Sequence, residues 1–364
     1  MLDPIAPTPA AHPDADRRSD VLTVVFGVWM LIGLFLDGWA HNEKLPDGFF
    51  TPWHAVLYTG FAGAAGVTLR SAVHRSTRSA WRDRLAGVDR VALAGLGLFL
   101  LGGAGDLFWH EMFGVETNLD ALLSPTHLLL MTGGVLTLSG PFRRAWRAPR
   151  PPNSLRSFLP GLISLSLTVG VLIFFTAYAS PFGRTTVATF ESVTTHLHEF
   201  SRPSNAAFEQ VREMWALTTI LFTTFVVVLP ALALIRWWSP PRGSMMVLFV
   251  AIGIFQVGSG EFFRSPLALA VFAAGAVAEV AVAHRAPAWV FGAVIPAVLW
   301  SSYMLLVAVV YDLRWSPELW AGSIVLSCAF GAIIGLVAIP RWTKPQPQDH
   351  PVMSAEEQST PADA

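Results

Sequence analysis

Apolar runs long enough to cross a lipid bilayer recur along the chain from Val21 to Ile339. A helix needs about 20 mostly apolar residues to cross the hydrocarbon core, so each run is a candidate membrane span. Of the 364 residues, 53% are hydrophobic and only 13% are charged, which is typical of a polytopic membrane protein. We therefore predict an all-α fold, a polytopic integral membrane helical bundle in contact with membrane lipid.

We predict about ten transmembrane helices, several of them short enough to tilt or break locally. The flanking segments 1–20 and 341–364 are predicted to be disordered tails around a bundle at 21–340. No small-residue cleavage site follows the first apolar run, which favours a retained helix over a signal peptide. The predicted spans are 21–40, 52–69, 88–110, 125–140, 157–179, 212–235, 244–260, 266–283, 288–311 and 317–339.

Basic residues concentrate in alternate connections between these spans. Eighteen of the 24 Lys and Arg residues lie in the two tails and in connections such as 70–90 and 141–156. Basic connections stay on the cytoplasmic side of a membrane. The distribution predicts a multi-pass protein of the cell membrane with both termini cytoplasmic.

Two segments place an Asp four residues before a His near the predicted outer end of a span. The pairs are Asp37 with His41 and Asp106 with His110. Side chains four residues apart lie on the same face of a helix. Each pair therefore offers a carboxylate and an imidazole to one site.

After each pair, a short connection leads into a new apolar run through Thr or Ser, Pro, any residue and His. These segments are 51–54 and 124–127. The hydroxyl residue is a preferred N-cap and Pro is favoured at the first helical position, so His54 and His127 are expected in the first turn of the next helix. Asp37, His41 and His54 form the first triplet, and Asp106, His110 and His127 form the second.

Two imidazoles and one carboxylate are a metal-ligand set that suits copper, iron or zinc and leaves coordination positions open. A single Asp or His within a membrane is often a structural group paired with a neighbour. Two matching triplets at one depth favour a functional site instead, because ionisable groups there cost free energy. The single Cys328 excludes a thiolate cluster.

Further His and Glu residues lie near the triplets or in the long predicted outer connection 180–211. Glu111 and Glu116 lie beside the second triplet and are candidates for additional ligands or for orienting its imidazoles, or are solvated loop residues. Long connections often act as lids or binding elements. Within this one, the candidates to complete the site are His196, His198 and Glu199.

The spacing Asp37-x3-His41-x12-His54 resembles the copper-ligand pattern in the C subunit of copper membrane monooxygenases, the particulate methane and ammonia monooxygenases. The second triplet occupies the place of a similar triplet in that subunit. The resemblance covers roughly residues 30–140. It implies copper at the first triplet, a second metal position at the second, and oxygen chemistry on a small apolar substrate.

The leading hypothesis is therefore a metal-dependent, copper-containing integral membrane oxidoreductase of monooxygenase type, which would need an electron donor and partner subunits. A copper-handling or metal transport protein would use the same ligands to pass an ion onward. A haem-binding membrane protein is the third hypothesis, although its histidines would not be expected to come with carboxylates. No phosphate-binding loop or nucleophile motif occurs, and the short basic connections do not indicate nucleic acid.

The two hairpins at 21–140 are also predicted to be copies of one unit. Weaker versions of their pattern occur at 261–266 and 311–318, without a His. The bundle is then built from repeated two-helix units. The half at 157–340 would serve as scaffold.

Overall fold

The computed structural model describes residues 13–45, 48, 50–76, 89–114, 119–148, 152–183, 206–236, 239–311 and 313–338. These residues are helical apart from short connections, and no strand occurs among them. Seven of the described helices are long and apolar enough to cross a membrane. The prediction of an all-α, multi-pass membrane bundle is confirmed at this level.

The helices of the N-terminal half include the segments that carry both triplets. They are α1 (Pro13–Asn42), α2 (Pro52–Ser76), α4 (Arg90–Phe113), α5 (Leu119–Leu123), α6 (Pro125–Leu138) and α7 (Gly140–Arg147).

The remaining helices follow α7 in the chain. They are α8 (Leu155–Phe175), η1 (Ala177–Ala179), α10 (Ala206–Ile235), α11 (Ser244–Gly258), η2 (Ser265–Leu267), α12 (Ala268–Ala283), α13 (Ala288–Val310) and α14 (Pro317–Ala338).

Each of the ten predicted spans coincides with one of these helices, but not all have the length and hydropathy of a membrane span. The shorter apolar helices α6 and α11 have 14 and 15 residues. Helix α2 has 25 residues but is not among the seven candidates either. Seven membrane spans are therefore supported by length and composition, and the total of ten spans remains a prediction.

Helices extend into segments that were predicted to be irregular. Helix α1 begins at Pro13, inside the tail 1–20, and α10 begins at Ala206, inside the connection 180–211. Helix α7 occupies part of the connection 141–156. Hydropathy detects only the apolar part of a helix, whereas backbone hydrogen bonding continues through the polar turns at its ends.

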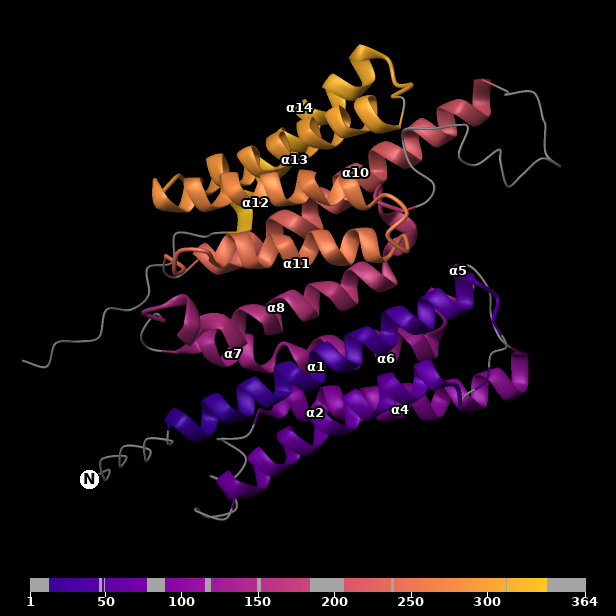
Figure 1. The fold of residues 1–364 in the computed structure, drawn as a ribbon, viewed down its shortest axis with the longest axis vertical. Helices are drawn as coiled ribbons and strands as arrows, with labels where there is room; N and C mark the ends of the chain where they lie inside the picture. Colours follow the sequence, from indigo (N-terminus) through magenta and orange to yellow (C-terminus); the bar gives the residue numbers. More distant parts are fainter. Residues whose placement is uncertain are drawn as a thin grey trace, which may run out of the picture.

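The helices form two groups that share α8 (Figure 1). Helices α1, α2, α4 and α6 pack around one core, and α10 to α14 pack around another. Alternate faces of α8 enter both cores: Leu167 and Val171 contact the first, and Leu165 and Val169 the second. With 78% of its span buried, α8 is the central helix of the bundle.

Glycines bring α1 and α2 into very close contact. A Cβ atom on Gly33 would lie 2.3 Å from the backbone nitrogen of Leu57, and one on Gly60 would lie 2.4 Å from that of Met30. No side chain fits at such distances. The two backbones touch here, as small residues allow in membrane helix pairs.

Helices α4 and α6 cross at glycines that hold the same positions relative to the second triplet as the glycines of α1 and α2 hold relative to the first. A Cβ on Gly102 would lie 2.9 Å from the nitrogen of Leu130, and one on Gly133 would lie 2.5 Å from that of Phe99. Gly102, like Gly33, precedes the Asp of its triplet by four residues, and Gly133, like Gly60, follows the second His by six. Both hairpins are therefore held by one contact pattern, while repetition further along the chain remains a prediction.

An ion network fixes the opposite end of this half. Arg143 donates to both carboxylate oxygens of Asp89 at 2.9 Å, and Arg144 donates through Nε to Asp20 at 2.8 Å. Asp89 also caps α4 by accepting from the backbone of Ala92. Burial lowers the pKa of Arg143, and Asp89 opposes that shift. The network ties α1, α4 and α7 together.

We expect Gly133→Ala to loosen the second hairpin, whereas Gly97→Ala should leave it intact. The first substitution forces a methyl group into the α4 backbone, and overpacking of this kind costs about 1–3 kcal/mol. The second meets nothing within 4 Å and removes a helix-interior glycine. Thermal unfolding in detergent, followed by tryptophan fluorescence, measures both. Equal melting temperatures would contradict the importance of this crossing.

Candidate metal centres

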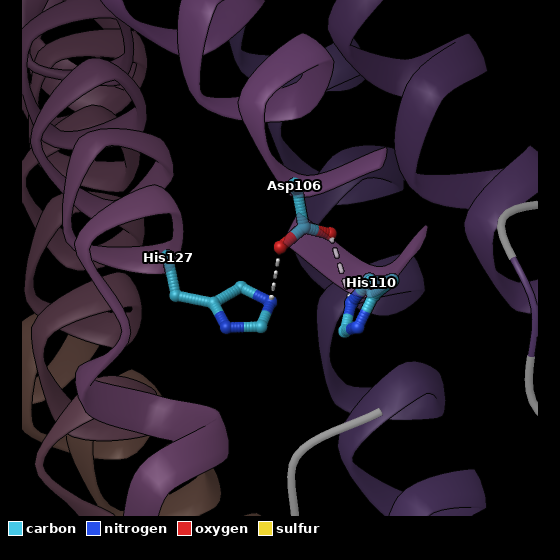
Figure 2. Close-up of side chains that lie close together, drawn as sticks. All are labelled: Asp106, His110 and His127. Carbon is cyan, nitrogen blue, oxygen red and sulfur yellow. Dashed lines mark ion pairs between the residues drawn. The ribbon is translucent and has the colours of Figure 1, made fainter. Parts of the chain in front are cut away.

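The second triplet brings its three side chains together around one carboxylate. The Nε2 atom of His110 lies 3.3 Å from Oδ2 of Asp106, and Nε2 of His127 lies 3.4 Å from Oδ1. Figure 2 shows the two imidazoles facing different oxygens of the same carboxylate, which is buried. One donor atom from each residue can be chosen so that all three lie within 4.8 Å of one another.

The start of α6 positions His127. Ser124 accepts a hydrogen bond from the backbone nitrogen of His127 at 3.3 Å, and Pro125 follows at the first helical position. In the first hairpin, Thr51 accepts from the backbone nitrogen of His54 at 3.4 Å. The predicted location of both histidines in the first turn is confirmed.

The ring of His110 is oriented by a backbone carbonyl. Its Nδ1 lies 3.3 Å from the oxygen of Gly114, which can only accept a hydrogen bond. Nδ1 therefore carries the proton in the neutral ring. The lone pair of Nε2 then points toward Asp106.

A chain of hydroxyl groups gives His127 the same tautomer. Thr126 donates to Oδ1 of Asp106 at 3.0 Å, which uses its only hydroxyl hydrogen. The hydroxyl of Ser124, 3.1 Å from that of Thr126, must then donate to Thr126. Ser124 is left to accept from Nδ1 of His127, at 2.9 Å. The neutral ring again presents the lone pair of Nε2 to the carboxylate.

Two lone pairs and a carboxylate facing one another repel unless a positive charge lies between them. A metal cation would satisfy all three donors. Ligating imidazoles typically donate their second N–H to a carbonyl or other acceptor, as both rings do here. Protonation of the imidazoles would satisfy the same geometry through ion pairs, which is the structural alternative to metal binding.

The first triplet has the same composition, but among the described residues only the second triplet brings three ligand atoms within 4.8 Å of one another. His54 Nε2 lies 3.2 Å and His41 Nε2 lies 3.8 Å from the same oxygen, Oδ1 of Asp37. Nδ1 of His54 lies 3.0 Å from the carbonyl oxygen of Gly48 and 3.0 Å from the hydroxyl of Thr51. His54 is therefore oriented like the rings of the second triplet. Unlike them, both imidazoles converge on a single carboxylate oxygen.

The structure describes only one of the other predicted site residues. Glu111 is exposed on the last turn of α4. Glu116 and the three candidates from the long connection, His196, His198 and Glu199, lie outside the described residues. Their contribution to either triplet stays a prediction.

Sequence reasoning missed the groups that orient the imidazoles. Thr126 and the carbonyls of Gly48 and Gly114 were not singled out, although Ser124 and Thr51 were expected as helix caps. The hydroxyl residue three positions before each His was the available signal. At that spacing it caps the helix and also reaches Nδ1 of the His.

Comparisons with protein-family models, curated proteins and solved structures give no match to this chain.

We expect Ser124→Ala to weaken metal binding at the second triplet about 10- to 100-fold, the usual effect of removing a group that orients a ligand. The matched control is Ser124→Thr, which keeps the hydroxyl and reproduces Thr51 of the first hairpin. Cobalt(II) titration of the purified protein measures both. If Ser124→Ala and Ser124→Thr bind equally well, the hydroxyl has no orienting role.

Proposed function

We propose that this chain is a metal-dependent integral membrane oxidoreductase with two metal centres, one at each triplet. The observation that carries the proposal is the arrangement around Asp106. Both neighbouring imidazoles are held through Nδ1, so that Nε2 of each neutral ring points at the carboxylate. In the neutral rings this leaves Nε2 free to ligate a metal ion, and a structural ion pair would use the same contacts with both rings protonated.

Copper is the proposed metal, with iron and zinc as alternatives. Two imidazoles and a carboxylate suit all three ions. The resemblance of Asp37, His41 and His54 to the copper membrane monooxygenase pattern favours copper. When bound, such an ion would supply oxygen activation, and three protein ligands leave coordination positions open for it.

The residues of the chain would tune each centre in three ways. Asp37 and Asp106 offset the charge of a cation in a site that is largely buried. The carbonyls and hydroxyls fix the imidazoles, which limits reorganisation. Phe108 and Phe113 of α4 are exposed apolar side chains beside the second triplet in the sequence and would give a hydrophobic substrate a route to that centre.

We expect His54→Ala and His127→Ala each to remove one metal ion per chain from the purified protein. Loss of a ligand weakens coordination directly, while the hairpin crossings hold the bundle. His284→Ala is the matched control, because His284 is exposed and bonds only its own helix through Val280 in the described contacts. Elemental analysis of wild type and variants gives the stoichiometry. Equal metal contents would reduce the triplets to structural pairs.

A measurement of oxygen consumption distinguishes an oxidoreductase from a copper-handling protein. An oxidoreductase should consume oxygen with a small apolar substrate and a reductant, and His127→Ala should abolish this. A handling protein would bind the same metal without such consumption.

We propose that both termini are cytoplasmic and that the triplets lie near the outer surface, as the eighteen basic residues in alternate connections indicate. In a Cys328→Ser background, Asn118→Cys should react with an impermeant thiol reagent in intact cells. The control Asn153→Cys, in the exposed turn before α8, should react only after the membrane is opened. The reverse pattern would overturn the proposed topology.

A further inference from the structure

The last residue of α1 is bound to a loop of the other helix group. Asn42, which directly follows the candidate ligand His41, donates from Nδ2 to Oε1 of Glu261 at 2.7 Å. Two turns earlier on the same face of α1, Phe35 packs on Phe255 of α11 with ring centroids 5.9 Å apart. The contact between α1 and the second group therefore continues beyond the apolar helices to the turn that carries His41.

The end of α1 closes through a residue in an unfavourable backbone conformation. The backbone nitrogen of Lys44 donates to the carbonyl oxygen of His41 at 3.1 Å, and the nitrogen of Leu45 donates to that of Ala40 at 3.0 Å. Helices often end with this pair of bonds, and the first donor is then usually a glycine in the left-handed conformation. Lys44 has that conformation here, with φ 53°. A side chain is disfavoured at such a position, so the turn gains less from its own closure than a glycine would give it.

The corresponding helix end of the second hairpin is closed by a glycine. Gly114 follows His110 by four residues and has a φ of 80°. Its backbone nitrogen donates to the carbonyl oxygen of His110 at 3.0 Å, and its own carbonyl oxygen lies 3.3 Å from Nδ1 of the same imidazole. The local chain thus holds His110 at the end of α4, whereas the turn that carries His41 is joined to the other helix group.

The loop that carries Glu261 is packed against the second core. A Cβ on Gly260 would lie 2.9 Å from the carbonyl oxygen of Phe182, and Arg264 at the end of the loop is buried. Glu261 and Phe262 have φ values of 56° and 58°, which residues with a side chain rarely adopt. Strained conformations persist where the surrounding structure enforces them, and they concentrate at functional sites.

We propose that Glu261 is a positioning residue of the first metal centre, acting through Asn42 to hold His41 in place. The inference rests on the metal binding proposed for the triplets. Nε2 of His41 lies 3.8 Å from its carboxylate, against 3.2 to 3.4 Å for the other three imidazoles. A ligand at a helix end moves with the last turn, so an anchor on the next residue limits its movement. The second helix group then sets the geometry of a site that lies in the first.

Removing this hydrogen bond should affect the first triplet alone. Glu261→Gly deletes the acceptor, and glycine suits the positive φ at this position, so the loop itself is not strained by the change. We expect this variant to bind cobalt(II) at the first triplet about 10-fold more weakly, as is usual when a group that orients a ligand is lost. Glu261→Gln keeps an oxygen that accepts from Asn42 and should bind as the wild type does.

The test is a cobalt(II) titration of the full-length protein in detergent. Affinity at the first triplet is measured in a His127→Ala background, and affinity at the second triplet in a His54→Ala background. Asn42→Ala should weaken the first triplet as much as Glu261→Gly does. The two substitutions together should weaken it no more than either alone, because both remove the same bond.

Hydrogen exchange of the metal-free protein tests the anchoring without a bound ion. The amides of Lys44 and Leu45 close the last turn of α1, so Glu261→Gly and Asn42→Ala should both speed their exchange. The amide of Gly114, which closes the end of α4, should exchange at the wild-type rate in both variants.

Three results of the titration would overturn the role of Glu261 and leave the metal centres standing. They are a wild-type affinity in Glu261→Gly, an equal loss at both triplets, and a loss in Glu261→Gln as large as that in Glu261→Gly. Unchanged exchange at Lys44 and Leu45 would overturn it as well. No cobalt binding in the wild type overturns both this inference and the proposed function.

Discussion

The close crossing of two helices in each N-terminal hairpin is the contact on which both candidate centres depend. Where Gly33 meets Leu57 and Gly102 meets Leu130, the backbones touch without intervening side chains. A crossing at this distance leaves the Asp, one turn beyond the glycine, facing the His at the start of the partner helix. Larger residues would separate the helices and take the imidazoles out of reach of the carboxylates. In lipid, where no hydrophobic force drives helices together, such backbone proximity is a principal source of helix association.

The polar groups at this end of the bundle are costly to bury and are satisfied by one another. Asp106 is 3% exposed and is contacted by Thr126 and by two imidazoles. Ionisable groups within membranes persist mainly when they pair or serve a function. Backbone carbonyls orient His54 and His110, and the hydroxyl chain orients His127. Each of these three rings therefore has a fixed donor side. The same network that makes burial tolerable therefore leaves Nε2 of these rings facing a carboxylate.

The other half of the molecule has a different character. Its core is built around Trp300, Tyr303 and Phe182, with Trp300 donating to Thr224 at 2.8 Å and Tyr303 donating to the carbonyl of Pro181 at 2.6 Å. These are structural hydrogen bonds that satisfy the polar tips of buried aromatic residues. Through α8 this core packs against the hairpin pair, and the scaffold role of 157–340 stays a prediction. Close glycine crossings are not confined to the hairpins, because Gly292 and Gly331 bring α13 and α14 together in this half as well.

The sequence by itself determined the class of fold, the approximate helices and the six residues of the triplets. Apolar runs of fixed length and an Asp four residues before a His are local patterns, and local patterns are visible in a sequence. The caps at Thr51 and Ser124 were predictable for the same reason. Only the tertiary structure decided how the triplets differ: both imidazoles of the first meet one oxygen of Asp37, while those of the second take separate oxygens of Asp106. It also placed Thr126 on Asp106. Contacts between residues far apart in the chain depend on the crossing distance and the rotation of packed helices, which spacing along one helix does not encode.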